Sequence, residues 1–210
     1  MRTLAILPVK RFELAKTRLS EQLRADQRRR LAEAMVTDVL DALRSSRQLA
    51  AVLVVTNEPA VAALAQARGA GVLPDPAESG QSAAALVGIA HALAGGFERA
   101  LLVPGDCPAL DQQALSTLLE RPTSPPAVTI VSDRAGSGTN ALLLAPADAI
   151  EPAFGPGSFA RHRALARAAG AAWHAEPLPG LLLDIDTPED LDALRSARAG
   201  QATRAVLAEL

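Results

Sequence analysis

The chain is poor in the residues that mark several common classes of protein. Among its 210 residues it has one cysteine, no tyrosine and only 2% aromatic residues. A single thiol excludes an internal disulfide and is typical of the cytoplasm, and so few aromatic side chains disfavour an aromatic-cored β-sandwich. No apolar run approaches the ~20 residues of a membrane span, and the net charge of −2 creates no field that attracts nucleic acid or an anionic membrane. We therefore expect a cytoplasmic protein with no nucleic-acid or membrane partner.

Several catalytic motifs are missing as well. The sequence contains no Gly-x-Ser-x-Gly, His-Glu-x-x-His or Cys-x-x-Cys motif, and no lysine after position 16 that could complete a Walker loop. The three histidines, His91, His162 and His174, show no metal-ligand spacing and are expected to be structural or exposed. Cys107 lies between an aspartate and a proline, so we expect a packed small side chain there rather than a nucleophile.

The rarity of lysine makes the two lysines informative. The chain has 21 lysines and arginines together, and only Lys10 and Lys16 are lysine. Both follow the first predicted strand, in a segment that also contains Arg18. A compact ammonium is a good partner for phosphate, although two lysines could also fall in one loop by chance. We expect Lys10, Lys16 and Arg18 to bind a polyphosphate.

Short apolar runs alternate with helical periodicity along the chain. This alternation predicts right-handed crossovers and a mainly parallel sheet flanked by helices, which is an α/β fold. We expect a single domain over residues 1–210, with a surface loop at 122–126 and a short helix or loose tail at 199–210. Strands are expected at 3–9, 51–56, 69–73, 101–103, 127–131, 171–176 and 181–186, with one more that ends at 144. Helices are expected at 24–46, directly after the turn at 57–59, in a segment that ends near 93, and in segments that begin at 111, 158 and 188.

Three carboxylates follow two of the predicted strands. Asp106 comes after the apolar run at 101–103 and a Pro-Gly pair, and Asp184 and Asp186 come after the run at 181–183. Ligands of open α/β sheets bind outside the carboxyl ends of the strands. Three carboxylates at that edge are the minimum for a hard divalent cation. The sequence therefore predicts a metal site at Asp106, Asp184 and Asp186.

Glycine-rich segments supply candidate anion sites. Gly80 and Ser82 lie at a helix start, where backbone amides can meet an anion or a sugar hydroxyl, although an ordinary N-cap is the alternative. The loop with Gly136 and Gly138 could form an anion nest, and a helix start at 155–158 lies beside several arginines. Cations for a polyphosphate, carboxylates for Mg²⁺ and a second anion site together indicate phosphoryl or nucleotidyl transfer.

Five stretches of the sequence resemble one known family. They occur in the family's order and with near-family spacing, and they resemble the phospholactate or phosphoenolpyruvate guanylyltransferases of coenzyme F420 biosynthesis. The resemblance runs from about residue 4 to residue 195. The stretches are Leu7–Lys10 with Ala15–Ser20, Pro104–Pro108, Gly138–Leu142, Phe154–Ser158 and Leu183–Leu191.

The resemblance implies a glycosyltransferase-A-like, Rossmann-like nucleotidyltransferase fold. GTP would bind over the first loop, and a phosphate oxygen of a three-carbon acid would attack its α-phosphorus and release pyrophosphate. Phosphoenolpyruvate is the favoured acceptor, with 2-phospho-L-lactate and 3-phosphoglycerate possible, and the product would pass to the next enzyme of the pathway. The implied catalytic residues are Lys16, Asp106, Asp184 and Asp186, and the three aspartates would bind Mg²⁺. The implied nucleotide contacts are Lys10, Lys16, Arg18, Gly80 and Ser82. The acceptor would sit on the amides around Thr139 and on Gly155 and Ser158.

Two alternatives remain open at this point. The family usually has Gly-Leu-Asn where this chain has Gly80-Gln81-Ser82, so the contact of Ser82 with base or ribose departs from the family pattern. A cytidylyl- or sugar-nucleotidyltransferase would use the same scaffold. A non-catalytic nucleotide-binding regulatory protein would need none of the three carboxylates.

Overall fold

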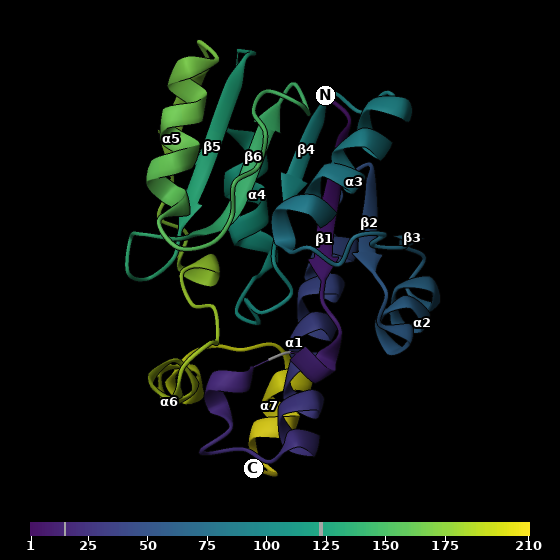
Figure 1. The fold of residues 1–210 in the computed structure, drawn as a ribbon, viewed down its shortest axis with the longest axis vertical. Coiled ribbons are helices and arrows are strands. Elements are labelled where there is room, and N and C mark those ends of the chain that lie inside the picture. The colour runs from purple at the N-terminus through teal and green to yellow at the C-terminus, as the bar shows by residue number, and fades with distance from the viewer. Residues whose placement is uncertain (15, 122–123) are drawn as a thin grey trace.

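A seven-stranded sheet runs through the residues that the computed structural model describes, which are 1–14, 16–121 and 124–210 (Figure 1). The strand order is β3-β2-β1-β4-β6-β5-β7, and β6 alone runs antiparallel to its neighbours β4 and β5. The predicted mainly parallel sheet is therefore confirmed. The strands are β1 (Thr3–Val9), β2 (Ala51–Thr56), β3 (Gly71–Leu73), β4 (Arg99–Leu102), β5 (Ala127–Ser132), β6 (Thr139–Ala145) and β7 (Ala172–Ala175).

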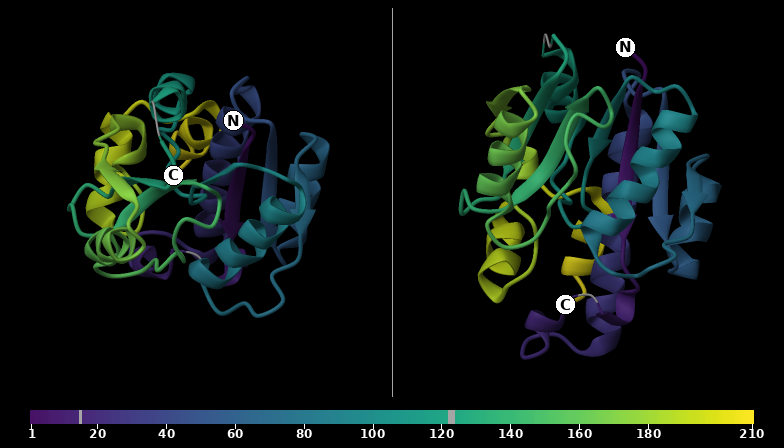
Figure 2. Two further views of the ribbon diagram at one scale, coloured as in Figure 1. Left: turned by 90° about the horizontal axis from the view of Figure 1, so that it is seen from above. Right: turned by 45° about the horizontal axis from the view of Figure 1, so that its top comes forward.

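Helices cover both faces of this sheet, which is why the central strands read as continuous apolar runs. Side chains of α1, α2 and α4 pack on one face, and those of α3 and α5 pack on the other. Figure 2 shows the two helix layers on opposite sides of the sheet in the view from above. These helices are α1 (Ala25–Ser45), α2 (Pro59–Ala67), α3 (Gln81–Ala94), α4 (Gln112–Glu120) and α5 (Ser158–Ala168). Of the predicted loop at 122–126, Pro122 and Thr123 lie outside the described residues.

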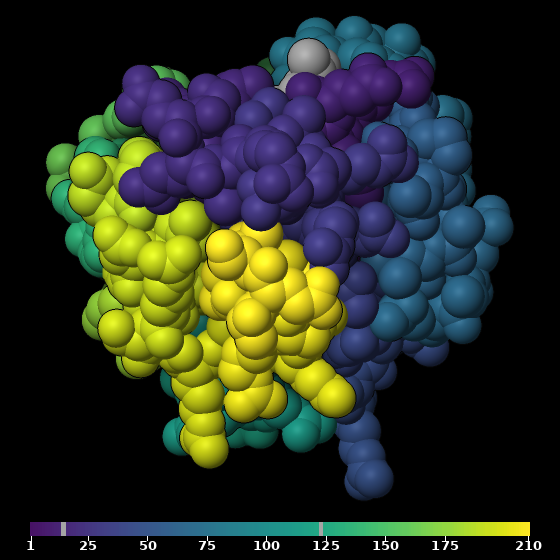
Figure 3. Space-filling model, turned by 90° about the horizontal axis from the view of Figure 1, so that it is seen from below, coloured from purple at the N-terminus to yellow at the C-terminus, as the bar shows by residue number. Residues whose placement is uncertain are grey.

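A third apolar cluster lies below the sheet. It joins the short helix η2 (Thr17–Leu19), the first half of α1, the segment after η3 (Pro179–Leu181) and α6 (Pro188–Ser196). Seen from below, the N-terminal segment, α6 and the C-terminal segment form one continuous surface (Figure 3). Because the N-terminal loop packs here, residues from the start and the end of the chain can share one site.

The C-terminal residues form a docked helix, α7 (Gln201–Leu207). Both carboxylate oxygens of Asp38 on α1 accept hydrogen bonds from its first turn, at 3.0 Å from Ala202 N and 2.8 Å from Thr203 N. The amide of Gly200 donates to the carbonyl of Pro108 at 2.8 Å. The helix therefore also supports the loop that follows Asp106. No helix in the described part of the chain has the length and apolar character to cross a bilayer.

The expected strand at 181–186 is wrong. The chain forms η3 there and then runs without regular secondary structure to Thr187. The backbone groups find other partners, because the Leu181 carbonyl accepts from the Asn140 side chain at 2.8 Å and the Ile185 amide donates to the Asp106 carbonyl at 3.2 Å. Asp184 and Asp186 therefore lie on a tethered loop and not at a strand end.

Candidate active site

A cleft of about 800 Å³ opens beyond the carboxyl ends of β1 and β4. β2 follows β1 on one side and β4 lies on its other side, so the cleft sits where the order of the strands reverses. Such switch points are the usual ligand sites of open α/β sheets. Every predicted site residue except Ser82 lines it, namely Lys10, Lys16, Arg18, Gly80, Asp106, Thr139, Gly155, Ser158, Asp184 and Asp186.

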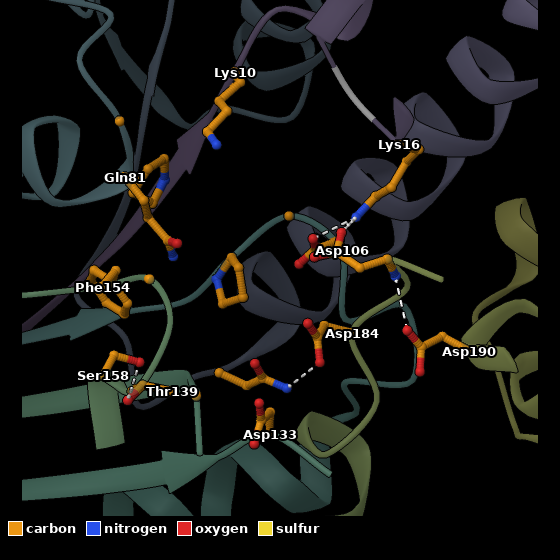
Figure 4. Close-up of a pocket in the computed structure, with 18 of the residues that line it drawn as sticks. Lys10, Lys16, Gln81, Asp106, Asp133, Thr139, Phe154, Ser158, Asp184 and Asp190 are labelled. Carbon is orange, nitrogen blue, oxygen red and sulfur yellow. Dashed lines mark hydrogen bonds and ion pairs between the residues drawn. The ribbon is translucent and has the colours of Figure 1, made fainter. Parts of the chain in front are cut away.

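Lys16 lies at the centre of one end of the cleft. Its ammonium donates to Asp106 Oδ2 at 2.6 Å and to Asp186 Oδ1 at 2.9 Å, and only 7% of its side chain is exposed (Figure 4). The backbone of Lys16 is left-handed, with φ 54°, where it caps η2. A β-carbon in that conformation costs energy, so the turn holds strain that the two ion pairs offset. We call Lys16, Asp106, Asp184 and Asp186 the carboxylate cluster.

The ion pairs set the charges of this cluster. Burial by itself would lower the pKa of Lys16, but the charges of Asp106 and Asp186 outweigh burial and raise it above its usual value. Burial would likewise raise the pKa of Asp186, but the charge and hydrogen bond of Lys16 outweigh burial and lower it. Lys10 and Arg18 add to that lowering, which places their charges near Asp186. Lys16 and Asp186 are therefore both ionised at neutral pH.

Asp184 differs from its two neighbours because no cation pairs with it in the described structure. Its Oδ1 accepts from the Asn140 side chain at 3.1 Å. Burial and the nearby charge of Asp106 raise its pKa, and the Asn140 bond offsets this only in part. A carboxylate held in this way gains from any added cation.

The donor chemistry of the cluster suits a hard divalent ion, but its arrangement is not yet a metal site. Within the described residues, no three His, Cys, Asp or Glu side chains are grouped closely enough to hold a metal ion. The Lys16 ammonium lies between Asp106 and Asp186 instead. Carboxylate oxygens are the ligands that Mg²⁺ prefers, and the raised pKa of Asp184 marks an uncompensated negative charge. The three carboxylates fit the ion only if the Lys16 ammonium moves away from Asp106 and Asp186. The three-carboxylate site therefore stays a prediction.

The other end of the cleft carries uncharged hydroxyls. Ser158 Oγ donates to Thr139 Oγ1 at 3.1 Å (Figure 4), and His162 Nδ1 lies 3.0 Å from the same oxygen. Thr139, Ser158 and His162 are all buried, although the first two reach the cleft wall. We call these three residues the hydroxyl cluster.

The backbone amide of Ser158 is hydrogen-bonded within the fold, and the expected acceptor contact of Ser158 stays a prediction. The Ser158 amide donates to the Gly155 carbonyl at 3.0 Å, and the Phe159 amide donates to the Ser137 carbonyl at 3.1 Å. These two amide donors in the first turn of α5 are therefore already hydrogen-bonded to backbone carbonyls. What Ser158 can offer a ligand is its hydroxyl.

The expected anion nest at Gly136 and Gly138 is occupied by the chain itself. Asp133 Oδ1 accepts from the Ser137 amide at 2.9 Å, and the Gly136 amide donates to the Asp133 carbonyl at 3.1 Å. A β-carbon on Gly138 would lie 2.5 Å from Asp133 Oδ2. This loop does hold an anion, but the anion is the carboxylate of Asp133.

On the expected nucleotide side, Gly80 caps α3 with φ 115°, a backbone that favours glycine, and nothing lies within 4 Å of where a β-carbon would be. Gln81 lines the cleft, whereas Ser82 does not. Ser82 Oγ accepts from the Phe154 amide at 2.9 Å and so links α3 to the loop before α5. The nucleotide contact expected of Ser82 stays a prediction, and its hydroxyl already makes this structural bond.

Three residues that the sequence reasoning did not place in the site belong to it. His162 was expected only to be structural or exposed, yet it supports Thr139. Asn140 positions Asp184 from β6, and Arg134 pairs with Asp190 across the cleft at 2.7 Å. Asn140 lies in the quoted Gly-Thr-Asn-Ala-Leu stretch, which was the one available signal. Cys107 is buried as expected, and burial raises the pKa of its thiol.

Comparisons with known proteins agree with this geometry. A nucleotide-diphospho-sugar transferase structure from Desulfovibrio desulfuricans G20 superimposes with a TM-score of 0.77 and covers 100% of this chain and 95% of its own, at 19% identity. That likeness shows the fold. A structure described as a nucleotidyl transferase from Methanothermobacter thermautotroptrophicus has the same fold, with a TM-score of 0.66 at 20% identity over 93% of this chain and 96% of its own.

Relatives at higher identity define the family. A phosphoenolpyruvate guanylyltransferase of Conexibacter woesei is 50% identical and aligns over 100% of this chain and 97% of its own. A protein of the same name from Sphaerobacter thermophilus is 40% identical over 92% of this chain and 93% of its own. The family described as Guanylyl transferase CofC like matches residues 3–210. The chain belongs to this family and is a guanylyltransferase.

Proposed function

We propose that the protein joins GTP to phosphoenolpyruvate, releases pyrophosphate and forms enolpyruvoyl-diphospho-guanosine for coenzyme F420 biosynthesis. The supporting observation is the two-ended cleft, with a charged cluster at one end and buried hydroxyls at the other. The relatives that share up to 50% identity carry the name of this reaction. The chain would act as a single domain over 1–210, in the cytoplasm, and pass its product to the next enzyme.

We infer that the triphosphate of GTP lies between Gly80 and the carboxylate cluster. Lys10 and Arg18 line that part of the cleft with exposed side chains, so both are free to turn toward phosphate oxygens. Lys16 would leave Asp106 and Asp186 and pair with the nucleotide's phosphates. Asp106, Asp184 and Asp186 would then hold Mg²⁺, which supplies charge neutralisation at the reacting phosphate.

The acceptor would lie against Thr139, Gly155 and Ser158. One of its phosphate oxygens forms a bond to the α-phosphorus of GTP while the bond from that phosphorus to the pyrophosphate oxygen breaks. A phosphate monoester loses its second proton near ~6, so it is already a dianion at neutral pH and needs no general base. The lack of a histidine beside the reacting atoms is consistent with this reaction.

The test is a parallel incubation of the purified protein with GTP, Mg²⁺ and either phosphoenolpyruvate, 2-phospho-L-lactate or 3-phosphoglycerate. We expect the guanosine-diphosphate adduct of phosphoenolpyruvate to dominate when the products are identified by mass. Thermal shifts with GTP, CTP, UTP and ATP give a second arm. A clear preference for CTP, or no adduct with any acceptor, would overturn the proposal.

The two alternative functions are not favoured. Nothing in the cleft distinguishes cytidine from guanosine nucleotides, but the named relatives at 40–50% identity are guanylyltransferases. A regulatory protein without catalysis is disfavoured by the same relatives and by the three carboxylates that line one cleft.

A further inference from the structure

His162 is the one histidine of the described structure that is fully buried, and it lies behind the cleft wall on α5. Its ring is 0% exposed, and it does not line the cleft. The edge of the ring meets Phe154 in a T-shaped contact with the centroids 5.2 Å apart. Both ring nitrogens have polar partners, as buried polar atoms require.

These partners fix which nitrogen carries the hydrogen. The Ala153 amide donates to Nε2 at 2.8 Å, so Nε2 must be the unprotonated nitrogen. Burial, with the charge of Arg161, lowers the pKa of His162 to about 4, and the ring is neutral at pH 7. In a neutral ring the hydrogen is then on Nδ1, where it is donated to Thr139 Oγ1 at 3.0 Å.

The fixed tautomer determines what the two hydroxyls can do. Thr139 and Ser158 share one hydrogen bond at 3.1 Å, which uses one of their two hydroxyl hydrogens. Because Nδ1 of the histidine donates to Thr139 and accepts no hydrogen bond from either hydroxyl, the second hydroxyl hydrogen has no partner within the cluster. Both hydroxyls lie at the cleft wall, so that hydrogen is available to an anion there.

We propose that His162 is a positioning residue for the acceptor substrate, because its Nδ1–H bond to Thr139 makes the Thr139–Ser158 pair a net hydrogen-bond donor to an anionic oxygen. This inference rests on the proposed function for the identity of the acceptor. According to this inference, His162 determines whether the acceptor-binding hydroxyls donate or accept hydrogen bonds, although His162 itself does not line the cleft. A histidine with the opposite tautomer would make the same pair an acceptor and would repel phosphate or carboxylate.

Two substitutions separate this role from plain packing. His162→Asn keeps a donor near the position of Nδ1, and His162→Gln keeps an acceptor near the position of Nε2. His91→Gln, on the exposed side of α3, is the matched control. We expect His162→Gln to raise the KM for phosphoenolpyruvate about tenfold, because Thr139 loses its donor, with the KM for GTP unchanged. His162→Asn should recover the KM for phosphoenolpyruvate to within about threefold of the wild type, and the two variants should melt at similar temperatures because each loses one buried hydrogen bond.

Equal KM values for phosphoenolpyruvate in the two variants, or an effect that falls on GTP, would overturn the inference. If neither variant folds, NMR of isotope-labelled histidine in the wild-type protein decides the matter, since a hydrogen found on Nε2 at neutral pH is equally fatal. The proposed function is judged separately by wild-type turnover. If the wild type forms the adduct but the Asn and Gln variants do not differ, only the inference about His162 is overturned. If the wild type forms no adduct, the proposed function is overturned.

Discussion

The two ends of the cleft are built on opposite principles. The carboxylate cluster consists of charges held together by Lys16, and its carboxylates come from segments nearly 80 residues apart along the chain. The hydroxyl cluster has no net charge, is buried, and is held by neutral hydrogen bonds between β6 and α5. In the proposed function, the ion pairs of the first would rearrange to accept a metal and a nucleotide, whereas the second would bind its ligand without such a rearrangement.

This difference bears on the net free energy of ligand binding at each end of the cleft. The Lys16 ammonium balances the negative charges of Asp106 and Asp186. Binding a cation and a triphosphate therefore exchanges one set of ion pairs for another, and the net gain is smaller than the contacts suggest. The hydroxyl cluster requires no such exchange.

The largest effect should come from Asp106, the carboxylate that pairs with Lys16 at 2.6 Å. Asp106→Asn leaves a side chain of the same shape but removes the charge that a metal ion requires, so turnover should fall by about a thousandfold or more. Steady-state rates of pyrophosphate release measure this. Asp148→Asn, an exposed aspartate outside the cleft, is the control and should keep the wild-type rate. A fully active Asp106→Asn would remove Asp106 from the proposed metal site.

Lys16→Met should have the next largest effect. It keeps most of the side chain's length but leaves Asp106 and Asp186 facing each other without a cation, so turnover should fall about a hundredfold. The fold should lose about 1–2 kcal/mol, a value reduced because Asp186 is half exposed. Melting curves with and without Mg²⁺ sharpen the comparison, because Mg²⁺ should restore more stability to this variant than to the wild type. Equal Mg²⁺ effects in both would show that Lys16 does not stand in for the metal.

Much of the fold could be read from the sequence because local patterns determine it. The buried parallel strands are continuous apolar runs, as at β1, and Thr187 begins α6 with a capping box in which its hydroxyl accepts from Asp190 N. The loop at 181–186 could not be predicted in this way. Its apolar run resembles a strand, but the partners of its backbone are Asn140 and Asp106, which lie far away in the sequence.

Nearly all the site residues that sequence motifs indicated line the cleft, but the motifs did not indicate the hydrogen bonds and ion pairs between them. Sequence motifs placed Lys16 and the three carboxylates together, and the cleft contains all of them. That Lys16 would bridge Asp106 and Asp186, or that Asp133 would fill the glycine loop, depends on tertiary distances that no local pattern encodes. The contact of His162 with Thr139 could not be predicted, because a single histidine on a helix gives no indication of its partners until the structure shows them.

Asp184 and Asp186 should respond to neutralisation with opposite signs when the protein is kept metal-free with a chelator. The raised pKa of Asp184 means that its charge destabilises the fold, so Asp184→Asn should raise the melting temperature. The lowered pKa of Asp186 means that its charge stabilises the fold, so Asp186→Asn should lower it. Each change should be about 0.5–1 kcal/mol after screening by solvent. Shifts of the same sign would contradict the charge pattern of the cluster.

The same two variants predict a pH dependence. Asp186 contributes stability above the ordinary aspartate pKa of about 3.9, and this contribution is lost as the pH falls through its lowered folded-state pKa. The cost of Asp184 is present above its raised folded-state pKa and is relieved as the pH falls below it. Denaturant melts of the wild type and both variants from about pH 7 to about pH 3 should therefore converge toward the acid end. Differences that persist unchanged at acid pH would have a cause other than charge.

The smallest expected effect tests whether the two ends of the cleft are coupled at all. Ser82→Ala removes the oxygen that accepts from Phe154, so the loop before α5 loses its tie to α3. We expect the KM values for GTP and for phosphoenolpyruvate to rise together, by about two- to threefold, because the lost bond joins the start of α3, proposed to meet GTP, to the loop before α5, proposed to meet the acceptor. Ser82→Thr keeps the hydroxyl and is the matched control. A rise confined to GTP would instead mean that Ser82 contacts the nucleotide directly, and the two clusters would then bind their substrates independently.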